Sequence, residues 1–306
     1  MELKINELAH CTLCPRACGV NRLAGERGYC GAVGEKVDIA LVSLHPWEEP
    51  CIAGKNGAGT VFFSHCSLRC VFCQNSEISS GGKGIAVDVP RLAEIFMEQQ
   101  ARGAATLDLV TPTHYAPQIA EALRIAKGNG LTIPVVWNSG GYETEELIES
   151  LEGLVDVYLP DMKYIDKESA GRYSRAENYF EKAEKALRAM VKQTGAPKLD
   201  GEGVMQRGVL VRHLVLPGRR KESMRIIDWI WETFGDKVWL SLMNQYTPLY
   251  HAKDYKEINR TLTTFEYDSV TDHAAELGIE HCYVQAGKTA SEKFVPCFDG
   301  RGVRKC

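Results

Sequence analysis

The strongest constraint on the fold is a regular alternation of short apolar runs and longer helix-period segments, which begins near residue 60. Runs rich in β-branched and aromatic residues predict strands at 61–63, 106–110, 133–137, 155–159, 209–216, 238–243 and 281–284. The segments between them predict helices near 88–103, 116–127, 143–151, 175–193 and 222–234. Continuous apolar strands that alternate with helices are typical of a parallel sheet covered by helices.

Polar and glycine-rich residues follow nearly every predicted strand, so they would gather at one face of such a sheet. This favours an α/β fold of the incomplete (β/α)6 TIM-type barrel kind, although alternation alone leaves an open doubly wound sheet as an alternative. We expect a small Cys-rich, metal-binding N-terminal extension over residues 1–50, the barrel over 51–286 and a tail over 287–306.

Composition restricts the possible partners. Of the 306 residues 44% are hydrophobic and 25% charged, and the net charge is −4, which gives no argument for nucleic acid or an anionic membrane as partner. The first residues form no apolar leader and no apolar run reaches 18 residues, so we expect a cytoplasmic protein. The chain has 11 cysteines, and in that compartment grouped thiols favour metal or cluster ligation over disulfides.

Three cysteines lie close together after the first predicted strand. Cys66, Cys70 and Cys73 have the spacing Cys-x3-Cys-x2-Cys, and Phe72 precedes the third thiol. Three thiolates can hold three corners of a [4Fe–4S] cluster, for which four cysteines are the usual complement, so one iron would stay open to a ligand. Part of a zinc site, or buried thiols that pack as small hydrophobes, are the alternatives.

A second cysteine group lies near the N-terminus, where glycines permit tight turns. Its four members are Cys11, Cys14, Cys18 and Cys30. Four thiolates form a complete ligand set, which predicts either a structural zinc site or an auxiliary [4Fe–4S] cluster, with unligated thiols as the alternative. The remaining cysteines show no ligand spacing: Cys51, Cys282, Cys297 and Cys306.

The order of the motifs adds a resemblance to a known family. The segments are GTVFFSHCSLRCVFCQN, LVTPTHY, VVWNSGGY, YLPDMKY, VRHLVLPG and SLMNQY. They resemble the radical S-adenosylmethionine (SAM) superfamily, and within it a family related to the pyruvate formate-lyase activating enzymes that act on glycyl-radical enzymes. The resemblance implies reductive cleavage of SAM at a [4Fe–4S] cluster to a 5′-deoxyadenosyl radical, which abstracts hydrogen from a substrate. A low-potential electron donor (flavodoxin or ferredoxin), an anaerobic setting and a protein or peptide substrate would follow, with a small molecule as the alternative substrate.

The resemblance also implies roles for individual residues. Cys66, Cys70 and Cys73 would hold the cluster, and Phe72 would lie near the adenine. The other expected SAM-binding residues follow the later strands: Thr111, Thr113, His114, Asn138, Ser139, Asp161, Lys163 and His213. The family's Gly-Gly-Glu-Pro and Asp-Thr-Asn-Gly motifs are replaced by Thr-Pro-Thr-His and Asn-Ser-Gly-Gly, so the group that receives the SAM ammonium differs and a charge is lost.

Each of these assignments has a structural alternative. Asp161 and Lys163 could form a solvated ion pair, and His114 and His213 could be packed core histidines. No residue is assigned as catalytic, and Gln245 and Tyr246 are candidates for contact with substrate. A non-catalytic iron–sulfur or zinc protein for electron transfer or interaction is the competing function. Release of 5′-deoxyadenosine from SAM separates it from the enzyme.

Overall fold

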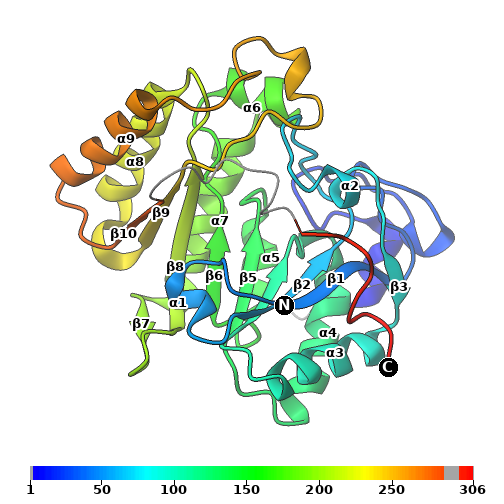
Figure 1. The fold of residues 1–306 in the computed structure, drawn as a ribbon. Coiled ribbons are helices and arrows are strands. Elements are labelled where there is room, and N and C mark those ends of the chain that lie inside the picture. Colours follow the sequence, from blue (N-terminus) through cyan, green and yellow to red (C-terminus); the bar gives the residue numbers. More distant parts are fainter. Residues whose placement is uncertain (1–2, 286–295, 306) are drawn as a thin grey trace.

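The computed structural model describes residues 3–285 and 296–305 and contains one large sheet (Figure 1). Its strands are β1 (Val37–His45), β2 (Ala58–Phe63), β3 (Ile85–Val87), β4 (Leu107–Val110), β5 (Val135–Ser139), β6 (Val157–Pro160), β7 (Lys198–Leu199), β8 (Met205–Leu214), β9 (Trp239–Met243) and β10 (Cys282–Val284). They lie in the order β10-β9-β8-β6-β5-β4-β2-β1-β3, and β7 pairs with β8 alone. The α/β class with a mostly parallel sheet is confirmed.

The seven strands predicted from the apolar runs form the parallel part of this sheet. Each neighbouring pair from β2 to β10 is parallel, with Leu109 opposite Val61 and Trp137 in the β2–β4–β5 register. Because parallel strands need crossover connections, their carboxyl ends all lie at one edge. That edge carries the cysteine loop after β2 and the polar residues after β4, β5 and β6.

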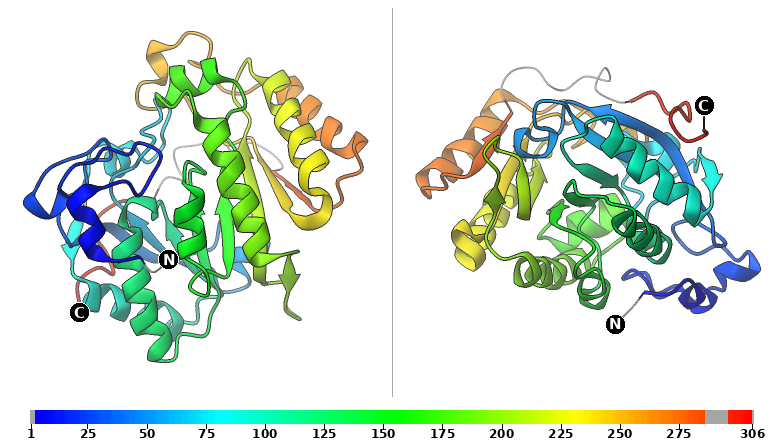
Figure 2. Two further views of the ribbon diagram at one scale, coloured as in Figure 1. Left: turned by 180° about the vertical axis from the view of Figure 1, so that it is seen from behind. Right: turned by 90° about the horizontal axis from the view of Figure 1, so that it is seen from below.

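Helices cover the outer face of the curved sheet (Figure 2). The α-helices are α1 (Pro50–Ala53), α2 (Ser76–Ser79), α3 (Val89–Ala101), α4 (Ala116–Gly128), α5 (Glu145–Ser150), α6 (Lys167–Ser174), α7 (Tyr179–Thr194), α8 (Arg220–Phe234) and α9 (Thr264–Glu276). Short 3-10 helices are η1 (Ile5–His10), η2 (Arg22–Ala24), η3 (Thr113–Tyr115), η4 (Gly235–Lys237) and η5 (Ala252–Asp254). No described helix is long and apolar enough to cross a membrane.

Helix α3 illustrates how local sequence produces this cover. Asp88 caps its start by accepting a hydrogen bond from the Arg91 amide at 3.0 Å, and Pro90 occupies the first turn. Leu92, Ile95 and Phe96 recur at helical spacing and are fully buried against the sheet. Burial of each such side chain contributes about 1.5–3 kcal/mol.

Strand β1 lies within the segment 1–50 that is predicted to be the extension. It pairs antiparallel with both β2 and β3, so the sheet begins within the segment assigned to the extension. The described end of the predicted tail also joins this part of the fold, since Gly300 donates to the Ala40 carbonyl and Val42 donates to the Arg301 carbonyl, both at 2.9 Å. Phe298 packs edge-on against Phe62, with ring centroids 5.6 Å apart. The rest of the predicted tail, 287–295 and Cys306, lies outside the described residues.

Candidate active site

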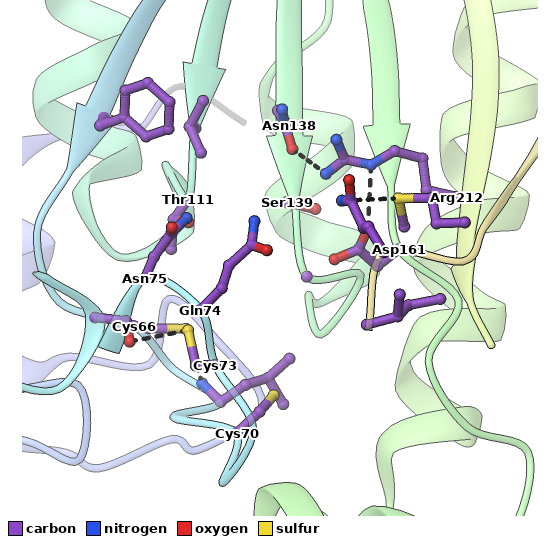
Figure 3. A pocket seen from close by; sticks show the side chains of 18 of the residues that line it. Cys66, Cys70, Cys73, Gln74, Asn75, Thr111, Asn138, Ser139, Asp161 and Arg212 are labelled. Atoms are coloured by element: carbon purple, nitrogen blue, oxygen red, sulfur yellow. Dashed lines mark hydrogen bonds and ion pairs between the residues drawn. The ribbon is translucent and has the colours of Figure 1, made fainter. Parts of the chain in front are cut away.

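A cavity of about 350 Å³ opens at the carboxyl ends of the parallel strands. The predicted site residues that line it are Cys66, Cys70, Phe72, Cys73, Thr111, Asn138, Ser139, Asp161 and Lys163. Figure 3 shows the cysteine loop on one side and the polar strand ends on the other, with Gln74 between them. The fold therefore brings most of the predicted residues to one cavity.

Hydrogen-bond donors surround the three thiols of the loop. The Leu68 amide donates to Cys66 Sγ at 3.3 Å, and the Ser79 hydroxyl donates to Cys73 Sγ at 3.3 Å. The Ser174 hydroxyl, from the end of α6, donates to Cys70 Sγ at 2.9 Å. Donors aimed at sulfur stabilise the thiolate, which is the form that binds metals.

The electrostatics of the thiols favour occupation by a cationic group. Burial, followed by the neighbouring Cys70, raises the pKa of Cys73 to about 12. Burial also raises the pKa of Cys70, although Lys163 opposes that rise. Three closely spaced thiolates would repel one another without a counter-charge, and iron supplies it. The loop thus fits a cluster held by three cysteines.

Arg212 on β8 organises the opposite wall and was missed by the sequence analysis. Its guanidinium donates to Asn138 Oδ1 at 2.5 Å and forms ion pairs with Asp161 at 3.2 Å and Glu48 at 3.3 Å. Its side chain is only 15% exposed, so the pairs lie in a low-dielectric setting. Lys163 Nζ contacts the other oxygen of Asp161 at 2.5 Å.

These contacts set the charges of the wall. Burial raises the pKa of Asp161, but Lys163 and Arg212 together hold it below its usual value. Burial lowers the pKa of Lys163, but Asp161 raises it above its usual value. Asp161 is thus an anion fixed between two cations, and the alternative of a solvated ion pair is wrong. Burial raises the pKa of Glu48 well above normal and that of Asp108 to about 7.

Alternation along β8 explains why Arg212 faces the cavity and the predicted His213 does not. The His213 ring lies on the helix side, with Nδ1 2.6 Å from the Met162 carbonyl and Nε2 2.9 Å from Ser223 Oγ. Burial lowers its pKa to about 4. The structure therefore gives His213 the core role that was the alternative. The signal was available, because Val211 and His213 share the apolar face and Arg212 must take the other.

Two of the three residues expected after β4 do not line the cavity. Thr113 donates to Glu143 Oε1 at 2.9 Å, and His114 Nε2 lies 2.7 Å from the Ser64 carbonyl. Burial lowers the pKa of His114 to about 3. Thr111 lines the cavity in a left-handed conformation, with φ of 61°. The turn that begins there carries the next residues into η3, behind the strand end.

Aromatic and polar side chains complete the cavity. Phe72 packs edge-on against Tyr173 and Tyr246, with centroids 6.3 and 5.8 Å away. Gln245 and Tyr246, the candidates for substrate contact, both line the cavity. Residues without a sequence signal also line it: Trp47, Glu48, Glu49, Gln74, Asn75, Thr247 and Gln285. Most of these come from connecting loops. A prediction based on which residues follow each strand does not give the paths of those loops.

The N-terminal cysteines lie near one another beside a buried arginine. Burial raises the pKa of Cys14 to about 12, and the negative charges of Cys30, Cys11 and Cys18 add to the rise. The Tyr29 amide donates to Cys18 Sγ at 3.3 Å. Arg22 is fully buried; Nη1 donates to the His114 carbonyl at 2.6 Å, while Nε and Nη2 have no partner.

An unpaired buried guanidinium is costly unless an anion lies nearby. Four thiolates around a divalent metal or a cubane cluster carry net negative charge, so they would neutralise Arg22. Across residues 3–285 and 296–305, no group of three or more His, Cys, Asp or Glu side chains is arranged to hold a metal ion. The four thiols therefore stay a predicted donor set, beside a buried cation with two unpaired donors.

The other cysteines lie elsewhere. Cys51 is buried beside β10, and Tyr283 is its hydrogen-bond partner. Cys282 is half-buried on β10, and Cys297 is exposed. Within the described part of the chain, these three thiols belong to neither cysteine group.

A model of the radical SAM superfamily matches residues 60–230. An uncharacterized protein of Methanocaldococcus jannaschii is 31% identical over 293 residues, which are 92% of this chain and 79% of that protein.

Solved structures with a similar fold include Streptococcus suis SuiB bound to the precursor peptide SuiA. It is 13% identical, with a TM-score of 0.49 over 72% of this chain and 46% of that chain. Native anSMEcpe with bound AdoMet is 16% identical, with a TM-score of 0.48 over 72% of this chain and 61% of that chain. This chain thus spans about half the length of the SuiB chain that it matches.

Proposed function

Because the chain belongs to the radical SAM superfamily, we propose that it cleaves SAM reductively at a [4Fe–4S] cluster held by Cys66, Cys70 and Cys73. The observation that carries this proposal is the shared cavity, in which the three thiols face the polar ends of β5, β6 and β8. When bound, the cluster and SAM supply a 5′-deoxyadenosyl radical that takes a hydrogen atom from the substrate. Three thiolates leave one iron open to SAM.

The opposite wall would orient SAM. Asp161 and Lys163 match the Asp-x-Lys of glycyl-radical activating enzymes, and both charges are fixed by their contact with each other. Asn138, Ser139 and Thr111 offer amide and hydroxyl groups to the ribose or the amino-acid part. Phe72, held by two tyrosines, offers a ring to the adenine. His114, Thr113 and His213 have no part in this proposal.

We propose a hydrogen donor that approaches from the mouth of the cavity. The cavity of about 350 Å³ lies at the lower end of the range for drug-sized ligands, so SAM would occupy most of it. A peptide loop of a partner protein would meet Trp47, which lines the cavity and is 72% exposed. This supports an activase-like role in which a protein glycine is the substrate. A flavodoxin or ferredoxin would supply the electron.

We also propose that Cys11, Cys14, Cys18 and Cys30 hold a four-thiolate centre. The unpaired Arg22 beside them supports an anionic site, and thiolates suit either zinc or an auxiliary cluster. Such a centre would supply folding energy to a short segment with few apolar residues. Iron and zinc quantification of the purified protein decides between the two metals.

The test of the main proposal is anaerobic reconstitution with iron and sulfide, followed by reduction in the presence of SAM. We expect release of 5′-deoxyadenosine by the wild type, and no release by Cys66→Ala, Cys70→Ala or Cys73→Ala. Cys282→Ala is the matched control, because that thiol lies on β10 outside the cavity. Wild-type protein that binds iron but leaves SAM intact would instead support a non-catalytic iron–sulfur protein.

The identity of the substrate needs a second assay. A purified glycyl-radical enzyme incubated with the active protein should gain the electron paramagnetic resonance (EPR) signal of a backbone radical. Deuterium at the partner's glycine should appear in 5′-deoxyadenosine. SAM cleavage without either signal would contradict the activase-like role and favour a small-molecule substrate.

A further inference from the structure

Arg16 lies between the two cysteine groups. In the sequence it stands between Cys14 and Cys18, within the N-terminal group. In the structure its Nε donates to the Ser67 carbonyl at 2.9 Å, next to Cys66. The N-terminal segment therefore contacts the cysteine loop after β2 directly.

The same guanidinium also holds the end of α6. Nη2 donates to the Ser174 carbonyl at 2.9 Å, and Nη1 donates to the Arg175 carbonyl. Arg175 ends the helix in a left-handed conformation, with φ of 50°, which a residue with a Cβ adopts only where its surroundings hold it. Arg16 is one group that stabilises this turn, because it binds two successive carbonyls there.

The Ser174 hydroxyl makes this turn important for the cluster site. It donates to Cys70 Sγ at 2.9 Å and lies 2.8 Å from the Tyr164 hydroxyl, and the residue is 1% exposed. Hydrogen bonds to cysteine sulfur are among the factors that set the reduction potential of an iron–sulfur cluster. The position of the Ser174 backbone therefore determines whether this bond forms.

Aromatic rings fix the guanidinium in place. Its central carbon lies 3.8 Å from the centroid of Tyr29 and 5.2 Å from that of Tyr142. The Tyr29 hydroxyl donates to the Leu68 carbonyl at 3.2 Å, so it ties the N-terminal segment to the cysteine loop a second time. The planar guanidinium uses three donors at once while it stacks on the Tyr29 ring. Lysine cannot reproduce this arrangement.

We infer that Arg16 is a positioning residue for the cluster: it holds the α6 turn so that Ser174 donates to Cys70. The N-terminal cysteine segment is then part of the cluster site, and not only an appended module. This inference rests on the proposed cluster at Cys66, Cys70 and Cys73. Loss of Arg16 acts on that cluster through the Ser174 hydroxyl.

The test measures the midpoint potential and EPR spectrum of the reconstituted cluster in the full-length protein. Ser174→Ala removes a donor to cluster sulfur, so it should lower the equilibrium constant for reduction by up to about tenfold, or about 59 mV for one electron. Arg16→Ala and Arg16→Lys should both lower the potential in the same direction. Arg27→Ala is the matched control, because Arg27 donates to the Gly31 carbonyl in the same segment, and we expect no shift.

The double variant Arg16→Ala/Ser174→Ala separates positioning from a general loss of structure. If Arg16 acts through Ser174, the double variant shifts the potential no further than the larger single change. Full additivity, an unshifted potential in Arg16→Ala, or a shift of equal size in Arg27→Ala would each overturn the inference. Absence of any cluster in the wild type would overturn the proposed function itself, which is a different result.

Discussion

Removal of Arg212 tests the charge balance of the cavity wall. Arg212→Met keeps the side-chain stem and removes the cation that pairs with Asp161 and Glu48. Asp161 retains Lys163 at 2.5 Å, so Glu48 is the carboxylate left without the cation that it contacts. Removal of one partner from a buried pair costs about 3–5 kcal/mol. Arg212 also lowers the pKa of Asp108 and of Asp161, so we expect a loss of about 3–5 kcal/mol near pH 8.

The loss should depend on pH in a defined direction. Burial raises the pKa of Glu48 well above its ordinary value of 4.5, and loss of the cation raises it further. Between the unfolded and folded pKa values the folded state then binds more protons, so stability falls as pH rises. At pH 5.5 the raised pKa of Glu48 favours its neutral form, which needs no cation, whereas Asp161 stays ionised and still loses its bond to Arg212. The remaining difference should therefore be smaller than at pH 8, about 1–2 kcal/mol.

The assay is urea unfolding of the metal-free protein at both pH values under anaerobic conditions. Arg188→Met is the control, because its pair with Glu184 lies on the surface of α7 with the arginine side chain 52% exposed. Exposed pairs contribute about 0–1 kcal/mol at any pH. If Arg212→Met costs no more than the control, or costs the same at both pH values, the account of a paired buried charge is wrong.

Three further predictions concern the scaffold. Glu143→Gln replaces a buried carboxylate that accepts from Thr113, Trp137 and Ser139, so it should cost about 2–3 kcal/mol in urea unfolding; an unchanged midpoint would contradict this. Phe298→Ala removes a ring packed on Phe62, and should cost about 3 kcal/mol and speed tryptic cleavage after Arg301; unchanged cleavage would refute the packing. Glu266 caps α9 and forms an ion pair with Arg260, and this pair is the main reason why the pKa of Glu266 is lowered. Glu266→Gln should therefore cost about 1–2 kcal/mol at pH 7. Because the folded pKa is depressed, that difference should shrink in unfolding curves as pH falls below 4.5; a constant difference would count against it.

The parallel strands and their polar ends were predictable because both signals are local. Apolar runs fix the strands, and the chain direction fixes which residues follow them. Asp161 follows β6 and Ser139 ends β5, so both reach the cavity as expected. To predict which side chains of a strand point into the cavity, one must also decide which face of the sheet each residue occupies. Without that decision, His213 was assigned to the site and Arg212 was not named.

Other features depend on contacts between distant segments. Strand β1 lies within the segment assigned to the metal-binding extension, and its pairing with β2 has no local signal as strong as a two-residue turn. Glu48 reaches Arg212 from the loop after β1, and Arg16 reaches Ser174 across 158 positions. Propensity and spacing describe neighbours in the chain, so they do not predict such pairs.

The attachment of residues 300–303 to β1 has a consequence for biosynthesis. Val42 forms a backbone hydrogen bond with Arg301, and Ala40 forms one with Gly300. Both partners leave the ribosome long after β1. During translation this flank of the sheet, with the Phe62 ring behind it, stays uncovered until the far end of the chain emerges. Closure of this flank can therefore begin only after residues 298–301 have been synthesised.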